Sequence, residues 1–251
     1  MHLPPLDDPP ASRHLGPMIR LILVTALAAL LYAGYWGLGA RATLADARTL
    51  AEDLRAAGWE VDWSDISLRG FPSRLDLTVE DPSVRLPGGD GWHAPFLQSL
   101  QLSYSRDRAI LVFPDRQTLT LSGTEIAVED TALRASIRGS GITAEAETLG
   151  LSWPGHRVTS GPVLAALRPE PGAPDTLQLY LRADEVRVDG VPLGTLLIEG
   201  RAFLEPGDAL PPGLAGIELT RLDTATSAGR AALAGAVAAI SPAAAAEVQR
   251  Q

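Results

Sequence analysis

The sequence predicts a mainly β protein held by a membrane anchor. An N-terminal transmembrane helix continues into a short amphipathic helix, and a large curved antiparallel β-meander follows. Three observations predict this order. An uncharged apolar run lies near the start, a segment with helical apolar spacing follows it, and apolar residues then alternate with polar ones along most of the remaining chain.

The uncharged run extends from Leu21 to Ala40 and is bracketed by Arg20 and Arg41. At about 1.5 Å per residue it makes a helix of roughly 30 Å, which matches the hydrocarbon core of a bilayer. Because lipid offers no partner to free backbone groups, a lone span must be helical. The sequence therefore predicts a transmembrane anchor over residues 18–41.

A cleaved secretory signal is the alternative, because Ala40-Arg41-Ala42 fits a small-x-small cleavage site before or at Ala42. The apolar run is longer than the roughly 7–15 residues of such a signal. Aromatic residues also gather near its end, as in an interfacial belt. The predicted membrane-interface residues are Tyr32, Tyr35 and Trp36. Length and aromatic belt together favour an anchor that is retained.

Small residues spaced four apart share one face of this helix: Thr25, Ala29, Ala33 and Gly37. Such a stripe lets two helices approach closely, so it is a candidate helix-dimer contact. Alanine is abundant throughout the chain, however, and a stripe of this kind also arises by chance. The oligomeric state stays open.

The segment before the anchor, residues 1–17, is proline-rich without apolar periodicity and predicts a disordered tail. Met18 directly precedes the anchor, so the natural start is either Met1 or Met18. A large domain is translocated largely regardless of the charges beside its anchor. We therefore expect a single-pass protein of the inner membrane with the bulk of the chain in the periplasm.

The composition excludes several classes of function. The net charge of −9 argues against nucleic acid as a partner, because that partner requires a clustered basic surface. The chain contains no cysteine and therefore no thiolate metal site or thiol nucleophile. It has no H-x-x-x-H pair, phosphate-binding loop, dinucleotide glycine pattern or G-x-S-x-G stretch. We expect no metal, no cofactor and no enzymatic activity.

A second helix is predicted after the anchor, over residues 42–58. Apolar residues recur in it at spacings of three and four: Leu44, Ala47, Ala51 and Leu54. Gly58 follows as a stop. We expect this helix to continue the membrane span and to lay its apolar stripe on the domain that follows.

Residues 59–223 are predicted to form the β-rich domain, with alternation as in Leu75-Leu77-Val79. Pairs such as Asp81-Pro82, Pro114-Asp115 and Asp189-Gly190 are predicted as turns between strands. About ten strands must each remove one apolar face from water, and few helices are left to cover them. The sheet must therefore curve on itself as an open trough, a sandwich or a partial barrel. Residues 224–251 form an alanine-rich tail that is predicted to be helical.

Residues from about 18 to 190 resemble the domain of unknown function 2125 family of membrane-anchored bacterial envelope proteins. The segments that carry the resemblance are, in order, Met18-Ile19-Arg20, Tyr32-Ala33-Gly34-Tyr35-Trp36, Gly58-Trp59, Leu68-Arg69-Gly70-Phe71-Pro72-Ser73-Arg74-Leu75-Asp76, Trp92-His93-Ala94-Pro95-Phe96, Leu102-Ser103-Tyr104, Leu111-Val112-Phe113-Pro114, Gln117-Thr118-Leu119 and Leu133-Arg134-Ala135-Ser136. Beyond Gly190 the chain departs from the family pattern. The resemblance implies a membrane-tethered, β-rich extracytoplasmic domain and supplies no catalytic residues.

We interpret the family-motif residues as structural. Gly70-Phe71-Pro72 fits a turn between strands, with Phe71 filling the core at the corner. Arg74 and Asp76 share one face and fit a solvated ion pair. The other family-motif residues in this group are Trp92, Pro95, Phe96, Phe113 and Pro114.

For function, the sequence suggests a non-enzymatic envelope protein whose curved sheet binds or contacts a lipid or another apolar ligand. The lipid bilayer itself is the other expected partner. A scaffold that packs on another envelope protein is the alternative. A hydrolase is the third possibility, with His93 and His156 as the histidines of the folded part.

Overall fold

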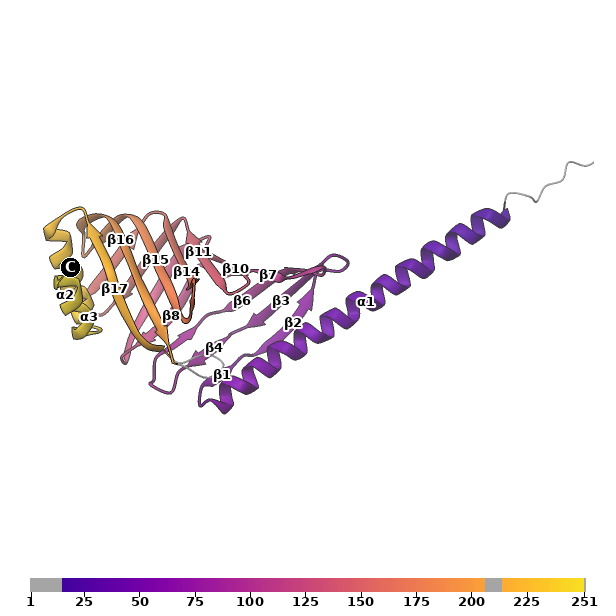
Figure 1. Ribbon diagram of the computed structural model, residues 1–251, viewed down its shortest axis with the longest axis horizontal. Helices are drawn as coiled ribbons and strands as arrows, with labels where there is room; N and C mark the ends of the chain where they lie inside the picture. Colours follow the sequence, from indigo (N-terminus) through magenta and orange to yellow (C-terminus); the bar gives the residue numbers. More distant parts are fainter. Residues whose placement is uncertain (1–14, 206–213, 251) are drawn as a thin grey trace, which may run out of the picture.

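A computed structural model describes residues 15–205 and 214–250 of the chain (Figure 1). It contains one long N-terminal helix, a sheet of 17 strands and two short C-terminal helices. The sheet is antiparallel and open, and it is not closed into a barrel. The predicted mainly β fold class is therefore confirmed.

The N-terminal helix α1 (Leu15–Ala56) runs unbroken for 42 residues. Its part from Ile19 onward is long and apolar enough to cross a membrane. The N-terminal half projects away from the β-domain, and the C-terminal half lies against β1, β2 and β3 (Figure 1). The predicted anchor and amphipathic helix are thus one helix without a break at residue 42. Its predicted apolar stripe includes Ala51, which is buried.

The helix begins earlier than the sequence predicted. Residues 15–17 were expected in a disordered tail, and the structure places them in the first turn of α1. Pro17 fits there because the backbone N–H groups of a first helical turn have no intrahelical acceptor. Proline has no backbone N–H, so no helical hydrogen bond is lost. The remainder of the predicted tail, residues 1–14, lies outside the described residues.

The strands from β1 to β14 join in consecutive pairs, and each pair is one chain segment bent at its middle. The pairs are β1 (Glu60–Asp62) with β2 (Asp65–Arg69), β3 (Arg74–Glu80) with β4 (Ser83–Arg85), β5 (Gly91–His93) with β6 (Phe96–Leu102), β7 (Ser105–Val112) with β8 (Arg116–Leu121), β9 (Thr124–Thr131) with β10 (Arg134–Arg138), β11 (Gly141–Ala146) with β12 (Thr148–Trp153), and β13 (His156–Ser160) with β14 (Val163–Glu170). Three longer strands complete the sheet: β15 (Ala173–Val188), β16 (Val191–Leu204) and β17 (Leu214–Thr224).

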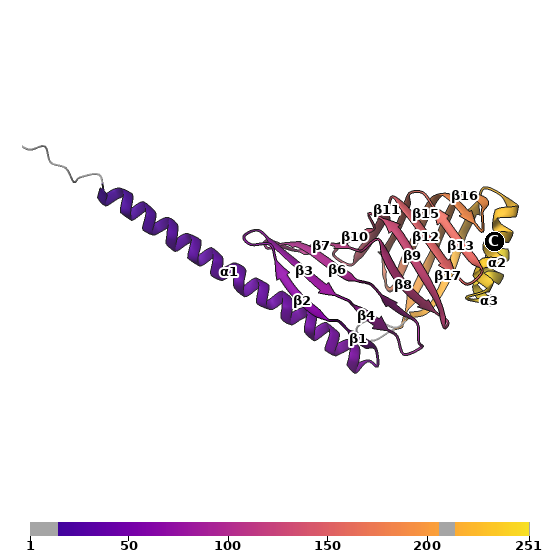
Figure 2. The ribbon, with the colours of Figure 1, turned by 180° about the vertical axis from the view of Figure 1, so that it is seen from behind.

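The bends divide the sheet into two limbs. The front limb follows the order β2, β3, β6, β7, β10, β11, β14, β15, β16, β17, and it faces the viewer at β14–β17 in Figure 1. The back limb follows the order β1, β4, β5, β8, β9, β12, β13, and Figure 2 shows its β8, β9, β12 and β13 from behind. The back limb joins β15 where Val158 pairs with Val188.

The register shows that the chain does not reverse at the bends. β3 pairs with β6 while β4 pairs with β5, so Asp81-Pro82 redirects one strand from the front limb to the back limb. Pro114-Asp115 does the same between β7 and β8. Both were predicted as turns between separate strands, and that prediction is wrong. Proline gives no ladder hydrogen bond, which suits a bend as well as a turn.

The facing sides of the two limbs meet in a core at the C-terminal end. Its buried members come from β9 and β12 of the back limb, from β15, β16 and β17, and from the two C-terminal helices: Ile126, Trp153, Ala183, Val186, Val188, Leu193, Leu196, Leu222, Leu233, Ala234, Ala236 and Val248. The helices are α2 (Ser227–Ala238) and α3 (Pro242–Arg250). Thr226 caps α2 by accepting a hydrogen bond from the amide of Gly229 at 3.0 Å. We call the sheet faces that carry this core inward, and the opposite faces outward.

Candidate functional site

The predicted interface tyrosines bind the β-domain at two hairpin tips. The Tyr32 hydroxyl donates to the carbonyl of Pro72 at 3.0 Å, in the tip between β2 and β3. The Tyr35 hydroxyl donates to the carbonyl of Ser103 at 3.3 Å, in the tip between β6 and β7. These tips therefore lie beside the middle of α1 (Figure 1).

Trp36 completes this junction between helix and hairpin. Its indole Nε1 donates to the carbonyl of Arg74 at 2.8 Å. Its ring meets the ring of Phe71 edge to face, with centroids 5.5 Å apart and planes at 90°. Phe71 is 57% exposed and packs on the helix, so the expectation that it fills the core is wrong. The correction has a simple cause, because the turn places Phe71 against Trp36 of α1.

The turn itself explains the other family-motif residues nearby. The Gly70 carbonyl accepts the amide of Arg74 at 2.8 Å, and Gly70 has a φ of 107°. A Cβ at this position would lie 2.8 Å from the Cβ of Arg74, so glycine is required here on two grounds. Arg74 pairs with Asp76 at 3.0 Å, with both side chains partly in solvent, as the spacing suggested.

An open groove lies beside this junction on the outward face of β3, β6, β7 and β10. Its volume is about 530 Å³. Leu100, Leu102 and Ile110 form its apolar part, and Leu102 and Ile110 are exposed to solvent. The remaining lining consists of polar residues, small residues and arginines, without any Asp or Glu: Arg74, Gln101, Ser105, Arg108, Ala109, Ser136 and Arg138.

The remaining family-motif residues lie at the bends between the two limbs. The Pro95 carbonyl accepts the amide of Asp81 at 2.9 Å, and Phe113 donates its amide to the carbonyl of Leu133 at 3.2 Å. Pro114 is buried beside Phe113. These backbone hydrogen bonds join neighbouring segments at the bends, where the regular ladders are interrupted. They therefore fix the position of the bends between the two limbs. Phe96 begins β6 directly after its bend.

A buried polar chain runs along the same line. Trp92 Nε1 donates to Gln117 Oε1 at 2.8 Å, and Gln117 Nε2 donates to Asp130 Oδ2 at 3.0 Å. Asp130 Oδ1 in turn accepts the amide of Leu133 at 3.2 Å. The ring of Trp92 also meets that of Phe113 edge to face, with centroids 6.2 Å apart. Every member has a partner, which fits a device that fixes the bend more closely than a reactive site.

The inward face is apolar along the front limb but is covered unevenly. The ladder places Ile142 opposite Leu167 and Ile137, and Leu167 opposite Leu179. Ile142 is 40% exposed, and the others are half-buried. On the same inward face, Val188 and other residues near α2 and α3 are fully buried. The inward face is therefore sealed at the end of α2 and α3 and partly open near the tip between β10 and β11.

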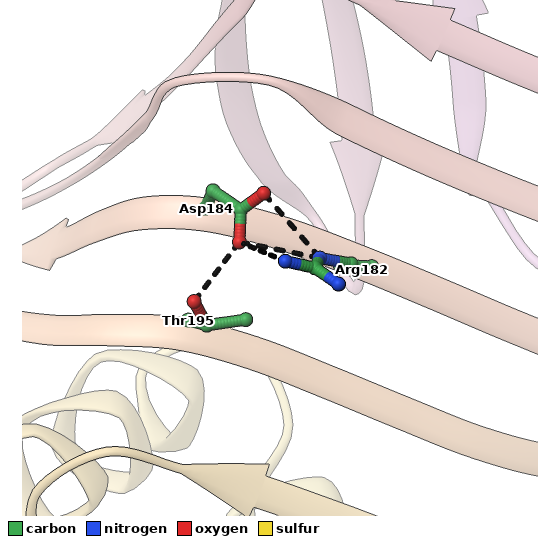
Figure 3. Close-up of polar contacts among 3 residues, drawn as sticks. All are labelled: Arg182, Asp184 and Thr195. Atoms are coloured by element: carbon green, nitrogen blue, oxygen red, sulfur yellow. Dashed lines mark hydrogen bonds and ion pairs between the residues drawn. The ribbon is translucent and has the colours of Figure 1, made fainter.

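A polar cluster on β15 and β16 has a structural explanation. Figure 3 shows Asp184 between Arg182 and Thr195. Arg182 Nη2 lies 3.1 Å from Asp184 Oδ1, and Thr195 donates to the same oxygen at 2.9 Å. The hydrogen bond from Arg182, with that from Thr195 second, lowers the pKa of Asp184. The cluster spans the irregular register of β15 after Ala183 and fastens it to β16.

The histidines do not assemble a hydrolytic site. His156 Nδ1 lies 2.8 Å from Asp189 Oδ2 at a hairpin turn, and this hydrogen bond, followed by that from the Arg157 amide, lowers the pKa of Asp189. Ser160, four residues after His156, donates its hydroxyl to the Leu149 carbonyl at 3.4 Å. His93 lies on β5, across the ladder from Ser83 and Thr118. Within the described residues, no group of three or more His, Asp or Glu side chains is placed to hold a metal ion.

The exposure of the predicted helix-dimer stripe changes along α1. Thr25 and Ala29 are exposed, while Ala33 and Gly37 are half-buried near the hairpin tips. The lower half of the stripe therefore lies where the chain already packs on itself. The dimer contact stays a prediction for the upper half.

Neither the curated proteins nor the solved structures contain a significant match to this chain. A family of uncharacterized proteins conserved in bacteria, DUF2125, matches residues 36–250. The match includes β16, β17, α2 and α3, so the expectation that the chain departs from the family beyond Gly190 is wrong. It also includes the hairpin tips, the bends and the sealed core described above. The chain belongs to the DUF2125 family.

Proposed function

We propose that this protein is a single-pass envelope protein of the bacterial inner membrane whose periplasmic β-domain takes up a lipid or similar apolar ligand between its limbs. α1 provides the tether, and the two limbs provide the apolar surface. The inner-membrane and periplasmic placement follows from translocation of a large domain behind a short N-terminal segment.

One observation carries the proposal: the inward face is sealed at one end only. Helices α2 and α3 close the C-terminal end around Ala236 and Val248. At the other end Ile142 is 40% exposed although the ladder aligns it with the core residues. Exposed apolar surface in line with a core costs free energy in water, so such surface marks a binding region for apolar groups.

The adjacent strand offers a matched comparison for the test. Leu164 on β14 is also 40% exposed, but it pairs with Glu145 and faces outward. A photo-crosslinking amino acid is placed at Ile142 or at Leu164 in the full chain, which is irradiated in bacterial cells. Mass spectrometry of the purified protein then identifies the adducts.

We expect lipid adducts at Ile142 and few at Leu164. Equal lipid adducts at both positions, or none at Ile142, would contradict the proposal. Adducts to another protein at Ile142 would favour the scaffold alternative instead. Hydrolase activity is not part of the proposal, because no described arrangement of His93, His156 or Ser160 supports it.

A further inference from the structure

The length of α1 sets the height of the hairpin tips relative to the bilayer. A hydrocarbon core of about 30 Å takes about 20 helical residues. Counted from Arg20, the core ends near Ala40, and counted from Leu15 it ends near Gly34. Tyr32 and Trp36 hold the tips at this level of the helix. On the count from Leu15 the tips lie at the boundary between hydrocarbon and headgroups, and on the count from Arg20 they reach about 6–12 Å into the hydrocarbon.

The tips carry the side chains that such a boundary favours. Phe71 is exposed in the tip between β2 and β3, and Tyr104 is exposed in the tip between β6 and β7. Leu102, just before that tip, is exposed as well and lines the outward groove. Aromatic and aliphatic side chains partition to the interfacial region of a bilayer, so these tips fit a surface that enters it.

The outward groove adds an arrangement of arginines that calls for an anion. Arg108 on β7 and Arg138 on β10 are direct partners across the ladder. Like charges at directly opposed positions repel each other and destabilise a sheet. Arg108 has Asp107 at 3.6 Å, whereas Arg138 has no ion pair in the described parts of the chain. Arg74, the third arginine of the lining, pairs with Asp76.

We propose that this groove binds an anionic phospholipid of the same bilayer, with the phosphate between Arg108 and Arg138 and the upper acyl chain on Leu102, which the register places nearer the tips than this arginine pair. A phosphate diester would relieve the repulsion between the two guanidinium groups through charge-assisted hydrogen bonds. Leu102 suits the first methylene groups of the acyl chain, and Leu100 and Ile110 line the groove on the other side of the arginines. The lipid is held on the outward face, so the proposal does not depend on a ligand between the limbs.

The chain offers a closely matched control for these arginines. The Arg108 side chain is 62% exposed and pairs with Asp107, and the Arg157 side chain is 63% exposed and pairs with Glu129. Arg157 lies in the back limb on β13, near the turn that contains Asp189. The test pair is Arg108→Gln with Arg138→Gln, and the control pair is Arg157→Gln with Arg187→Gln.

The full chain is placed in nanodiscs that contain equal amounts of phosphatidylglycerol and phosphatidylcholine, and native mass spectrometry measures the ratio of the two lipids that stay bound. We expect phosphatidylglycerol to be enriched on the unsubstituted chain. The test pair should lower the enrichment by roughly five-fold for each arginine removed, and the control pair should leave it unchanged. Equal loss in both pairs would show general charge attraction and would overturn the proposal.

A second measurement tests the height of the tips without relying on charge. Because the natural chain has no cysteine, a single spin label can be attached at Tyr104→Cys, or at Ser122→Cys in the turn between β8 and β9. In nanodiscs the label at residue 104 should collide more with oxygen and less with a water-soluble nickel reagent than the label at residue 122. Equal exposure of both labels to the nickel reagent would place the tips in water and refute the proposed binding mode. Circular dichroism confirms that each variant is folded.

Discussion

The two ends of the β-domain differ in how far they bury their apolar side chains. At the C-terminal end, long strands and two helices bury Val188 and Leu193 completely. At the end beside α1, shorter strands leave Phe71, Tyr104 and Ile142 exposed. Buried area stabilises a fold, whereas exposed apolar area is available to lipid or partners. The difference teaches that stability is concentrated at the sealed end, which leaves the end beside α1 free to carry apolar surface.

The largest expected difference between the ends concerns apolar truncation. Leu193→Ala should lower the free energy of unfolding by about 2–5 kcal/mol, because it leaves a cavity in the core. Ile142→Ala should lower it by less than about 1 kcal/mol, because part of that side chain is already in solvent. Urea unfolding of the full chain in detergent micelles measures both. Similar losses in the two variants would show that the limbs are equally packed at both ends.

The polar chain at the bends should rank second. Asp130→Ala removes an acceptor from the buried Gln117 amide and the Leu133 amide, at an expected cost of about 1–3 kcal/mol. Glu129→Ala, the next residue on β9, faces outward and should change stability by less than about 0.5 kcal/mol. The same urea experiment compares them. If Asp130→Ala left the free energy of unfolding unchanged, the bend would be held by backbone hydrogen bonds alone.

The junction with α1 should show a smaller and more local effect. Trp36→Phe removes the donor to the Arg74 carbonyl, worth about 1 kcal/mol, and so amides of residues 70–74 should exchange about five-fold faster. Trp63→Phe is the control, since Trp63 stacks under Arg55 at 4.9 Å and away from the tip. Hydrogen exchange with mass spectrometry reads both variants. Unchanged exchange at residues 70–74 in Trp36→Phe would show that the hydrogen bond from Trp36 does not stabilise the tip.

The smallest expected effect is the pH dependence of the cluster in Figure 3. Its hydrogen bonds lower the pKa of Asp184, so its contribution to stability is present above the unfolded value of 3.8 and lost as pH falls through the folded value. The melting temperature of the natural chain should therefore exceed that of Asp184→Asn at pH 6, and the gap should narrow below pH 3.8 and close as the pH falls through the folded pKa. Asp175→Asn, on the same strand, should show no such gap. A gap that does not narrow as the pH falls below 3.8 would contradict a charge-based role.

The sequence predicted the parts of the fold that follow local physical rules. An uncharged run of bilayer length requires a helix, and alternation with few helices requires an open or curved antiparallel sheet. The bends were misread as turns because Asp81-Pro82 has the chemistry of both, and only the register distinguishes a bend from a reversal. β16 was not predicted because Pro192, Gly194 and the run Leu196-Leu197-Ile198 break the alternation.

The candidate sites were harder to predict than the fold. Tyr32, Tyr35 and Trp36 were recognisable as boundary residues, but their acceptors lie about 40 to 70 positions further along the chain and no local pattern marks them. The outward groove is invisible for the same reason. Arg108 and Arg138 become neighbours only through the pairing of β7 with β10. Two arginines that end opposite one another carry no signal in the sequence until that pairing is known.

The meander has a consequence for how the chain folds. Each bent segment pairs with the segment before it and the segment after it, so most contacts are between neighbours along the chain. A domain of this kind can assemble progressively as the chain is synthesised, beginning at the strands beside α1. Helices α2 and α3 emerge last and complete the core. Until they arrive, the inward face is open along its whole length, although the strands beside α1 are already paired.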